Sequence, residues 1–510
     1  MDATAERTRS VWMDTQVAGG APLDQDEHAD VVVVGAGLAG LSAAYEITKA
    51  GRSVVVLDAG PIGGGMTART TGHVSSELDD LYHELVSMRG LEDARLCYRS
   101  MQAAVDRLGE IAEAEGIDCD YRRLDGYLFL APGDDPEILL REIDACHQVG
   151  FAGVIWVDKA PIPGVDTGRA LRFPNQARFH PLKYLDGLAR CVRRDGGRLY
   201  AETRVKAVEE VTGGEVVVTT ESGHTIRAAS AVVATNTPIN DRVAIHTKQA
   251  PYRTYVVTGR VPKGAVEDAL YWDTLDAYHY VRLQPGPGNA GHDYLIVGGE
   301  DHKTGHANDG EERFAKLEAW TRQHFPQVQD FPYRWSGQVM EPVDYLAFIG
   351  RNHNNDEVYI ATGDSGEGMT NGIIAGILLR DLVLGRENEW ARIYDPRRTT
   401  LKAALETMRE NLDVAANYRD YVTPGDVSSA EDLKPGQGAV IRQGLGKVAA
   451  YRDEAGVLHL RSAVCPHLGC VVRWNALERT WDCPCHGSHF ATDGTPLQGP
   501  STAPLAAVEG

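Results

Sequence analysis

Apolar residues near the start of the chain fall into short runs separated by a glycine-rich turn. Residues 31–34 are four consecutive valines, a pattern typical of a strand that is buried on both faces. Residues 38–50 have the composition of a helix, and residues 53–57 form a second apolar run. This order predicts a strand–helix–strand unit. Residues 1–29 show no periodicity and are predicted to be a tail or a covering strand.

Helical and strand-like segments continue along the chain without an internal repeat. Residues 77–115 are rich in acidic residues, Leu, Ala and Met, and they are predicted to be helical. Later apolar runs predict a helix at 373–384 and strands at 127–130, 215–220, 294–297 and 358–361.

The texture changes around residues 420–438, where Pro, Gly and Ser become frequent, as in a linker. Residues 424–510 carry nine acidic and seven basic side chains, a net charge of −2, so residues 1–423 carry −19 of the total of −21. This difference in charge and texture predicts a separate C-terminal domain of short strands and turns.

The chain as a whole is acidic, with 51 Lys and Arg against 72 Asp and Glu. Such a surface repels nucleic acid and anionic lipid. The longest apolar stretch, residues 31–45, has 15 residues and contains glycines, whereas a membrane helix needs about 20. The first residues include neither a basic nor an apolar leader segment. We therefore expect a soluble, cytoplasmic protein with no membrane insertion and no nucleic-acid partner.

Residues 35–40 read GAGLAG and lie between the first predicted strand and the first predicted helix. In a dinucleotide-binding turn, Gly35 would permit the tight turn, Gly37 would let a pyrophosphate approach the backbone, and Gly40 would let helix and strand pack closely. The helix N-terminus adds N–H donors for phosphate. Asp58 ends the second strand, where a carboxylate can bind ribose hydroxyls. The pattern predicts a dinucleotide site.

A second GxGxxG pattern is formed by Gly286, Gly288 and Gly291. A polar strand precedes this copy, and another strand rather than a helix follows it. We predict a hairpin loop there, because the flanking elements and not the glycine spacing decide what such a turn does.

A late glycine cluster at residues 363–370 follows a predicted strand and precedes a helix. Together with the early turn it resembles the FAD-dependent amine and amino-acid oxidases of the D-amino-acid oxidase type, in which the late turn lies against the isoalloxazine ring. The resemblance covers residues 29–390. It implies a Rossmann-like α/β FAD-binding domain with an inserted α+β substrate part. Besides the first motif, it implies FAD contacts from Thr67, Val205, Gly363, Gly366, Gly368, Met369 and Thr370.

The resemblance also indicates how FAD is held. Some of these oxidases attach FAD covalently through a histidine, and aligning Gly65 to Thr67 places Arg69 at that position. Others use a late cysteine, but no cysteine lies between Cys191 and Cys465. We therefore expect noncovalent FAD.

Four of the eight cysteines crowd into the C-terminal segment beside histidines. Cys465-x-His467 is followed by Cys483-x-x-His486. Two thiolates and two imidazoles suit either a structural zinc or a Rieske [2Fe–2S] cluster, in which two histidines ligate one iron.

The complete pattern CPHLGC…CPCHGS resembles the Rieske proteins of respiratory and photosynthetic cytochrome complexes. A tetrahedral zinc would leave Cys470 and Cys485 unused. The resemblance implies an all-β Rieske domain in which these two cysteines form a disulfide. It also implies one [2Fe–2S] cluster whose ligands are Cys465, His467, Cys483 and His486.

Candidate catalytic residues come from the segment DAYHYVRL and from the segment after the strand predicted at 294–297. In the resembling oxidases this hairpin roofs the substrate face of the flavin. Arg282 could clamp a carboxylate, and Tyr280 or His302 could accept a proton from an amine. The alternative is a polar hairpin with solvated ends. The acidic residues at 77–80 are predicted to be a solvated helix start.

These features predict a FAD-dependent oxidoreductase domain at residues 30–420, with its substrate part within 77–150 and 246–335, and a Rieske domain at 424–510. This order resembles bacterial FAD-dependent oxidoreductases with a C-terminal Rieske domain. We expect an amine or amino acid to reduce FAD, and the cluster to pass the electrons singly to an external one-electron acceptor. Two alternatives stay open: a reductase that takes electrons from an external donor through the cluster to FAD, and a redox sensor or electron carrier without turnover.

Overall fold

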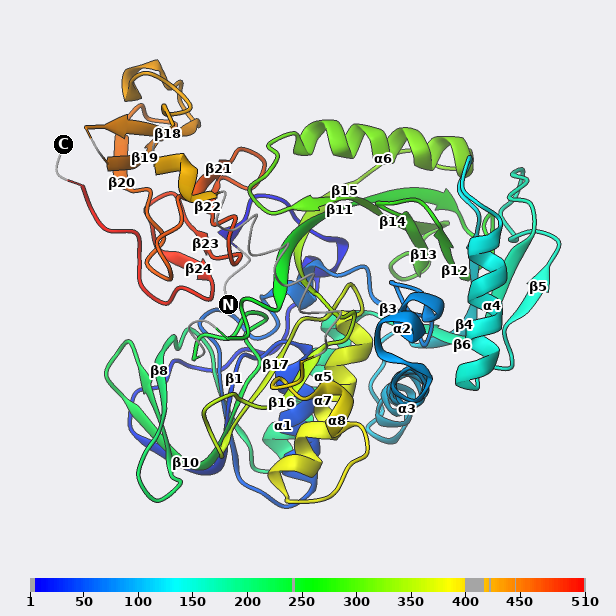
Figure 1. The fold of residues 1–510 in the computed structure, drawn as a ribbon, viewed down its shortest axis with the longest axis horizontal. Helices are drawn as coiled ribbons and strands as arrows, with labels where there is room; N and C mark the ends of the chain where they lie inside the picture. The colour runs from blue at the N-terminus through cyan, green and yellow to red at the C-terminus, as the bar shows by residue number, and fades with distance from the viewer. Residues whose placement is uncertain (1–4, 241–243, 400–416, 422, 445, 509–510) are drawn as a thin grey trace.

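The computed structural model describes residues 5–508 except 241–243, 400–416, 422 and 445. Two large sheets with their helices form most of the molecule, and a smaller C-terminal domain lies at one end (Figure 1). The first sheet contains β1 (Glu27–Val34), β2 (Val54–Leu57), β7 (Arg198–Tyr200), β8 (Val205–Glu210), β9 (Val216–Thr220), β10 (Thr225–Val233), β16 (Phe348–Arg351) and β17 (Val358–Thr362).

The strand order of the first sheet is β16-β17-β10-β1-β2-β7, with the hairpin of β8 and β9 attached to β10. The neighbours from β17 to β7 are parallel. Helices α1 (Leu38–Lys49), α5 (Pro181–Arg194) and α7 (Gly368–Val383) lie together on one face, and α1 packs against both others (Figure 1). The predicted strand–helix–strand unit is confirmed, and its valine run is 0–4% exposed because both faces of the sheet are covered.

The second sheet has the order β15-β11-β14-β13-β12-β4-β6-β3, with β5 beside β6. Helix α6 packs on β11 and β14. The elements of this part are β3 (His73–Val74), α2 (Tyr82–Arg89), α3 (Leu91–Ala114), β4 (Arg122–Phe129), α4 (Glu137–Val149), β5 (Ile155–Val157), β6 (Ala170–Arg178), β11 (Gln249–Pro262), β12 (Leu270–Asp273), β13 (Tyr280–Pro285), β14 (His292–Lys303), α6 (Gly310–His324) and β15 (Tyr333–Pro342).

The second sheet extends beyond the ranges 77–150 and 246–335 that the sequence predicts for the substrate part. Strand β6 and the end of β15 lie outside 77–150 and 246–335, yet both belong to the second sheet. The reason is that β6 pairs with β4 and β15 pairs with β11, and pairings between distant strands leave no local signal in the sequence. The second GxGxxG pattern lies in the loop between the antiparallel strands β13 and β14, so the prediction of a hairpin there is confirmed.

The N-terminal segment differs from the predicted tail. Short helix η2 (Val11–Asp14) packs into the molecule. Trp12 is fully buried, and its Nε1–H donates to the carbonyl oxygen of Thr70 at 2.6 Å. Ser10 Oγ donates to the carbonyl oxygen of Ala68. The segment therefore belongs to the core, although a lone tryptophan gives no periodic pattern.

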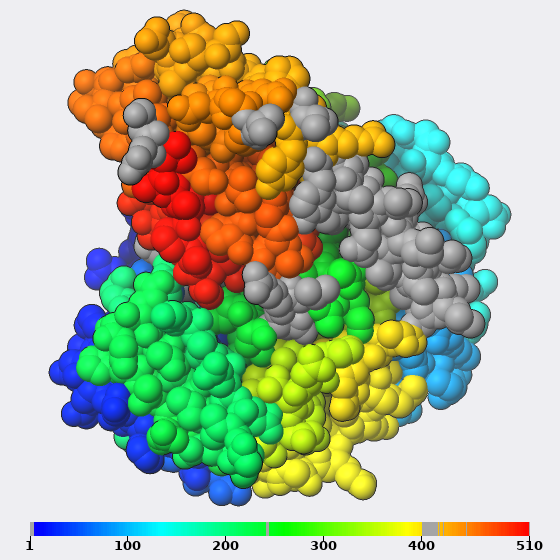
Figure 2. All heavy atoms as spheres, turned by 60° about the vertical axis from the view of Figure 1, so that its left-hand side comes forward, coloured from blue at the N-terminus to red at the C-terminus, as the bar shows by residue number. Residues whose placement is uncertain are grey.

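The C-terminal domain consists of two small antiparallel sheets. In the space-filling view its orange and red residues lie directly against green residues of the preceding part (Figure 2). None of the helices in the described residues is long and apolar enough to cross a membrane. The strands are β18 (Gly438–Gln443), β19 (Gly446–Arg452), β20 (Leu458–Ser462), β21 (Arg473–Asn475), β22 (Thr480–Asp482), β23 (His489–Phe490) and β24 (Pro496–Gln498).

Candidate active site and iron–sulfur site

A cavity of about 610 Å³ lies between the glycine turn after β1 and strands of the second sheet. Gly35 has φ +104°, and a Cβ there would lie 2.3 Å from the carbonyl oxygen of Ala234. A Cβ on Gly40 would lie 1.9 Å from the Gly35 oxygen. Gly37 instead borders the cavity, with Thr67 Oγ1 3.2 Å from its added Cβ. The turn is packed on its sheet side and open toward the cavity, as an approaching pyrophosphate requires.

Asp58 and Thr67 hold this turn and line the same cavity. The N–H of Ala36 donates to Asp58 Oδ2 at 2.6 Å, and the N–H of Gly60 donates to Oδ1 at 3.0 Å. Thr67 Oγ1 accepts from the N–H of Leu38 at 3.0 Å. The Asp58 carboxylate at the end of β2 is placed to bind ribose hydroxyls of a dinucleotide. The N-terminus of α1 beside it is placed to bind the phosphates.

The late glycine loop and the first turn of α7 border the cavity too, through Gly366, Gly368 and Met369. Gly366 has φ +72°, and a Cβ there would lie 1.8 Å from Asp79 Oδ2. This approach explains why the loop needs a glycine at that position. The other residues predicted to contact FAD are buried and do not line the cavity: Gly40, Val205, Gly363 and Thr370.

Besides Asp58, seven carboxylates line the cavity, and five of them, from four segments, matter as a group that the sequence did not reveal. We call this set the acidic wall: Asp79 and Asp80 before α2, Asp301 on β14, Glu341 on β15 and Glu367 before α7. Ser365 Oγ lies 2.8 Å from Asp80 Oδ2 and 2.9 Å from Glu341 Oε2. Burial raises the pKa of Asp80 and that of Asp301 to about 7. Burial and the charges of Asp80 and Asp79 raise the pKa of Glu341 well above its ordinary value.

The acidic residues at 77–80 are therefore not the solvated helix start that the sequence predicts. Glu77 is 2% exposed, and Asp79 and Asp80 line the cavity. The difference arises because Ser365, Gly366 and Glu341, which are distant in sequence, pack over this segment. The one local signal in the sequence is the apolar residue Leu78 within the acidic run, and Leu78 is buried in the structure.

The structure separates the three candidate catalytic residues. Tyr280 lines the cavity, and its hydroxyl lies 2.5 Å from Thr254 Oγ1. Arg282 is fully buried outside the cavity lining, and its Nη1 donates to two backbone carbonyl oxygens at 2.6 and 2.8 Å. His302 lies near the C-terminal domain instead, with Nε2 2.9 Å from the Tyr255 hydroxyl.

The predicted cluster ligands come together at the tip of the C-terminal domain that faces the preceding part. The thiols of Cys465 and Cys483 are in hydrogen-bonding contact. The rings of His467 and His486 meet edge to face, with their centroids 4.9 Å apart. Two thiols side by side and two imidazoles side by side fit a [2Fe–2S] cluster with sulfur on one iron and nitrogen on the other.

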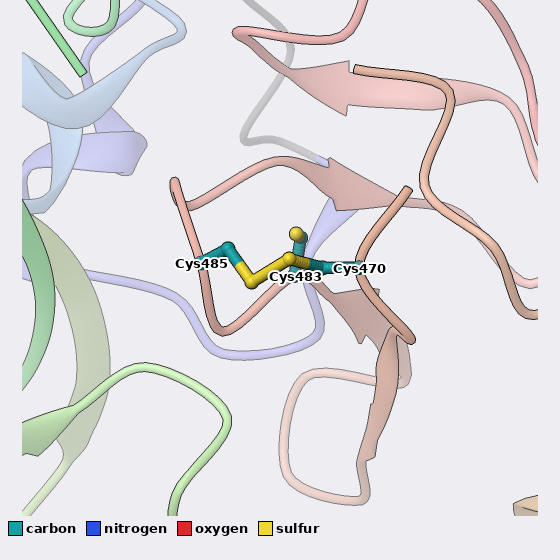
Figure 3. Close-up of side chains that lie close together, drawn as sticks. All are labelled: Cys470, Cys483 and Cys485. Atoms are coloured by element: carbon teal, nitrogen blue, oxygen red, sulfur yellow. A yellow bond between two sulfur atoms is a disulfide. The ribbon is translucent and has the colours of Figure 1, made fainter. Parts of the chain in front are cut away.

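Cys470 and Cys485 form a disulfide with their Cα atoms 6.5 Å apart. The sulfur of Cys483 lies within 4.8 Å of both disulfide sulfurs (Figure 3). The bond thus ties the two cysteine-bearing loops together directly beside the predicted ligands.

A residue of the preceding oxidoreductase part covers the histidine side of this site. His246 lies with its ring centroid 4.8 Å from that of His467 and 5.8 Å from that of His486. His467 is 8% exposed and His486 is 4% exposed. The sequence gives no signal for this contact, since His246 lies in no motif.

A buried set of charged residues joins the two domains below this contact. We call it the buried junction: Glu6, Arg69, Arg253, Glu478, Asp482 and His489. Arg253 Nη2 donates to Asp482 Oδ2 at 2.9 Å, and Arg69 Nη1 lies 3.2 Å from Glu6 Oε2. Burial by itself would raise the pKa of Glu6, but Arg69, His489 and Arg253 lower it to about 2.

Each of the two parts of the chain matches a known protein family. The FAD dependent oxidoreductase family matches residues 30–382, and the Rieske [2Fe-2S] domain matches residues 423–509. The chain therefore belongs to the FAD dependent oxidoreductase family and carries a C-terminal Rieske domain. It is an FAD-dependent enzyme with a [2Fe–2S] cluster, as the two motifs predict.

One relative is YhfW of Bacillus subtilis (strain 168), whose own name describes it as a Rieske 2Fe-2S iron–sulfur protein. The two sequences are 33% identical over 96% of this chain and 94% of the relative. Gamma-glutamylputrescine oxidoreductase of Escherichia coli (strain K12) is 29% identical over 71% of this chain and 85% of that protein. The crystal structure of glycine oxidase from Geobacillus kaustophilus has the same fold, with a TM-score of 0.62 and 19% identity over 73% of this chain and all of that one.

We expect all FAD to leave the protein when it is unfolded. Arg69 stands where some relatives carry the attaching histidine, and its guanidinium binds Thr8, Glu6 and the Ser336 carbonyl oxygen instead. Denaturation in guanidinium followed by gel filtration should separate a colourless chain from free flavin. Flavin absorbance that stays with the denatured chain would contradict the prediction.

Proposed function

We propose that this protein is a dehydrogenase for a cationic amine, and that it passes electrons from FAD to its Rieske cluster and then to an external one-electron acceptor. The acidic wall is the observation that carries the substrate class. Three of its members, Asp79, Asp301 and Glu341, come from separate segments and border one cavity. An ammonium group brought among them would gain charge-assisted hydrogen bonds that a neutral ligand lacks.

The same cavity offers little to a substrate carboxylate. Among the described lining residues Arg69 is the one arginine, and the lining contains no lysine. The Arg69 guanidinium is already bonded within the buried junction. Arg282, the other candidate clamp, donates to backbone carbonyl oxygens. These contacts favour an amine or diamine over an α-amino acid.

The aromatic side chains beside the acidic wall suit the same ligand. Tyr278 and Tyr280 line the cavity with ring centroids 5.4 Å apart, and Trp272 lines it as well. Ring faces attract cations and accept the methylene chain of an amine. The name of the relative gamma-glutamylputrescine oxidoreductase is in keeping with an amine substrate.

Oxidation of the bound ammonium to an iminium ion removes two electrons and two protons. FAD, when bound, accepts both electrons together with a proton as a hydride, and the second proton leaves the substrate nitrogen. A [2Fe–2S] cluster holds one electron, so two transfers to the external acceptor complete each turnover. Fusion of both sites in one chain keeps them at high effective concentration.

The test is an anaerobic titration of the holoenzyme with 1,4-diaminobutane, a monoamine, glycine and L-proline. We expect the diamine to bleach the flavin and to produce a Rieske EPR signal. Bleaching by glycine or proline alone would overturn the substrate class. Flavin reduction without any cluster signal would overturn the electron path, and cluster-first reduction by an external donor would favour the reductase alternative.

Replacing a carboxyl of the acidic wall with an amide should weaken amine binding, because an amide cannot ionise against the bound ammonium. Replacing Glu341 with Gln is expected to raise KM for the diamine by about tenfold or more, since a hydrogen bond to a charged group contributes roughly 1.5–3 kcal/mol. Glu312→Gln, on the exposed surface of α6, is the matched control and should leave KM unchanged. Equal KM values for both variants would contradict a role for Glu341 in binding.

The pH dependence of KM has a definite sign. Asp80 and Asp301, with pKa values of about 7, gain negative charge as the pH rises, while an aliphatic ammonium stays protonated up to about pH 10. KM for the diamine should therefore fall as the pH is raised through about 7. A KM that rises over this interval would contradict the prediction.

A further inference from the structure

One side chain bridges the wall of the cavity and the cluster loop. Gln338 lies on β15 and lines the cavity. It is 3% exposed, and its side chain reaches into the C-terminal domain. No motif marks this residue, and the function proposed above does not use it.

Every polar atom of the Gln338 amide has a partner. Nε2 donates to the carbonyl oxygen of Gly487 at 2.9 Å. Oε1 accepts from Thr304 Oγ1 at 3.0 Å and lies 2.8 Å from Nε2 of His489. The amide therefore holds two points of the C-terminal domain, one on each side of Ser488.

The contact with Gly487 is the one that reaches the cluster site. Gly487 directly follows His486, and its N–H donates to the carbonyl oxygen of Cys483 at 3.1 Å. Gly487 has φ +77°, and a Cβ there would lie 2.6 Å from Gln338 Nε2 and 2.9 Å from Pro251 Cβ. Backbone and amide approach this closely only because residue 487 has no side chain. Gln338 is thus connected through Gly487 to two of the four predicted ligands. The connection to Cys483 is a second hydrogen bond, and the connection to His486 is the peptide bond.

We propose that Gln338 is the positioning residue that couples the flavin site to the cluster site. It fixes the loop of His486 and Cys483 against the cavity wall and supplies a hydrogen-bonded route between them. In the coupled step one electron leaves the reduced flavin and one electron reduces the oxidised cluster, without any bond made or broken in Gln338. The inference rests on the proposed function only in that electrons cross between the two sites, and it holds for either direction.

Electron tunnelling falls steeply with distance and is favoured through bonded contacts. A side chain of the same length without hydrogen-bonding atoms should therefore slow the transfer even where both cofactors remain bound. Gln338→Met is this variant. Gln338→Glu is a second one, because it keeps the acceptor for Thr304 but loses the donor to Gly487.

The experiment uses holoenzyme with full FAD and iron content and no amine. A photochemical donor reduces the flavin in a flash, and absorbance then follows arrival of the electron at the cluster. We expect the transfer rate in Q338M and Q338E to fall by about tenfold or more, because a small misplacement of two reacting groups can slow their reaction strongly. Thr304→Val removes another bond of the same amide without touching Gly487, and its rate should stay near that of the unchanged protein.

Further readouts separate positioning from general damage. The cluster EPR spectrum and the photochemical rate of flavin reduction should be unchanged in Q338M. A transfer rate within twofold of the unchanged protein in both Gln338 variants would overturn the proposal, as would an equal fall in Thr304→Val. If one Gln338 variant fails to load its cluster, the other decides. Because no substrate is used, an error in the substrate class leaves this result unaffected.

Discussion

Replacing Cys483 with serine is expected to remove the iron–sulfur cluster altogether. Cys483 and Cys465 are the thiol pair of the site, in contact with one another and buried. Iron in such clusters prefers soft thiolate over a hydroxyl oxygen. Iron and acid-labile sulfide should fall from one cluster per chain to near zero, and the Rieske EPR signal should vanish. Flavin content should persist, because the FAD cavity is built by other segments.

Two controls make this result specific. Cys191→Ser alters a buried cysteine of α5, whose thiol donates to Glu115, and it should keep full iron. Cys470→Ser breaks the disulfide but removes no predicted ligand, so it should retain some EPR signal in fresh protein. Full iron and an unchanged EPR spectrum in C483S would show that Cys483 is not a ligand. Zinc in place of iron in the unchanged protein would revive the zinc alternative.

The sequence predicts those parts of the molecule that depend on neighbours along the chain. The valine run, the GAGLAG turn and the following helix lie within one short segment, and β1 and α1 follow them closely. The same holds for the cysteine and histidine spacings of the C-terminal domain. Each motif carries its own geometry, so one sequence suffices to recognise it.

The remaining features depend on contacts between distant residues. Asp80 and Glu341 meet through Ser365, and Gln338 meets Gly487. Nothing local distinguishes an aspartate on a solvated helix start from one that lines a cavity. Arg282 shows the opposite error. Its position in the sequence suggests a ligand clamp, but its guanidinium is buried and donates to backbone carbonyl oxygens.

Replacing Arg253 with methionine should strongly destabilise the attachment of the C-terminal domain. Arg253 is 2% exposed and donates to Asp482 at 2.9 Å and to Ser336 Oγ at 2.7 Å. Without it the buried Asp482 loses its ion-pair partner, and breaking a buried pair in this way costs about 3–5 kcal/mol. Unfolding in urea, followed by the visible circular dichroism of the cluster, should shift to clearly lower denaturant concentration.

The matched control is an arginine–aspartate pair with the same chemistry at the surface. Arg260 pairs with Asp330, and these side chains are 42% and 48% exposed, so Arg260→Met should cost less than about 1 kcal/mol. Adding Asp482→Asn to the Arg253→Met variant should restore part of the loss, because most of it comes from an unpaired buried charge rather than from the missing attraction. If R253M and R260M unfold at the same urea concentration, the junction does not hold the domains together. If only R253M unfolds at lower urea concentration, the buried junction stabilises the C-terminal domain against unfolding.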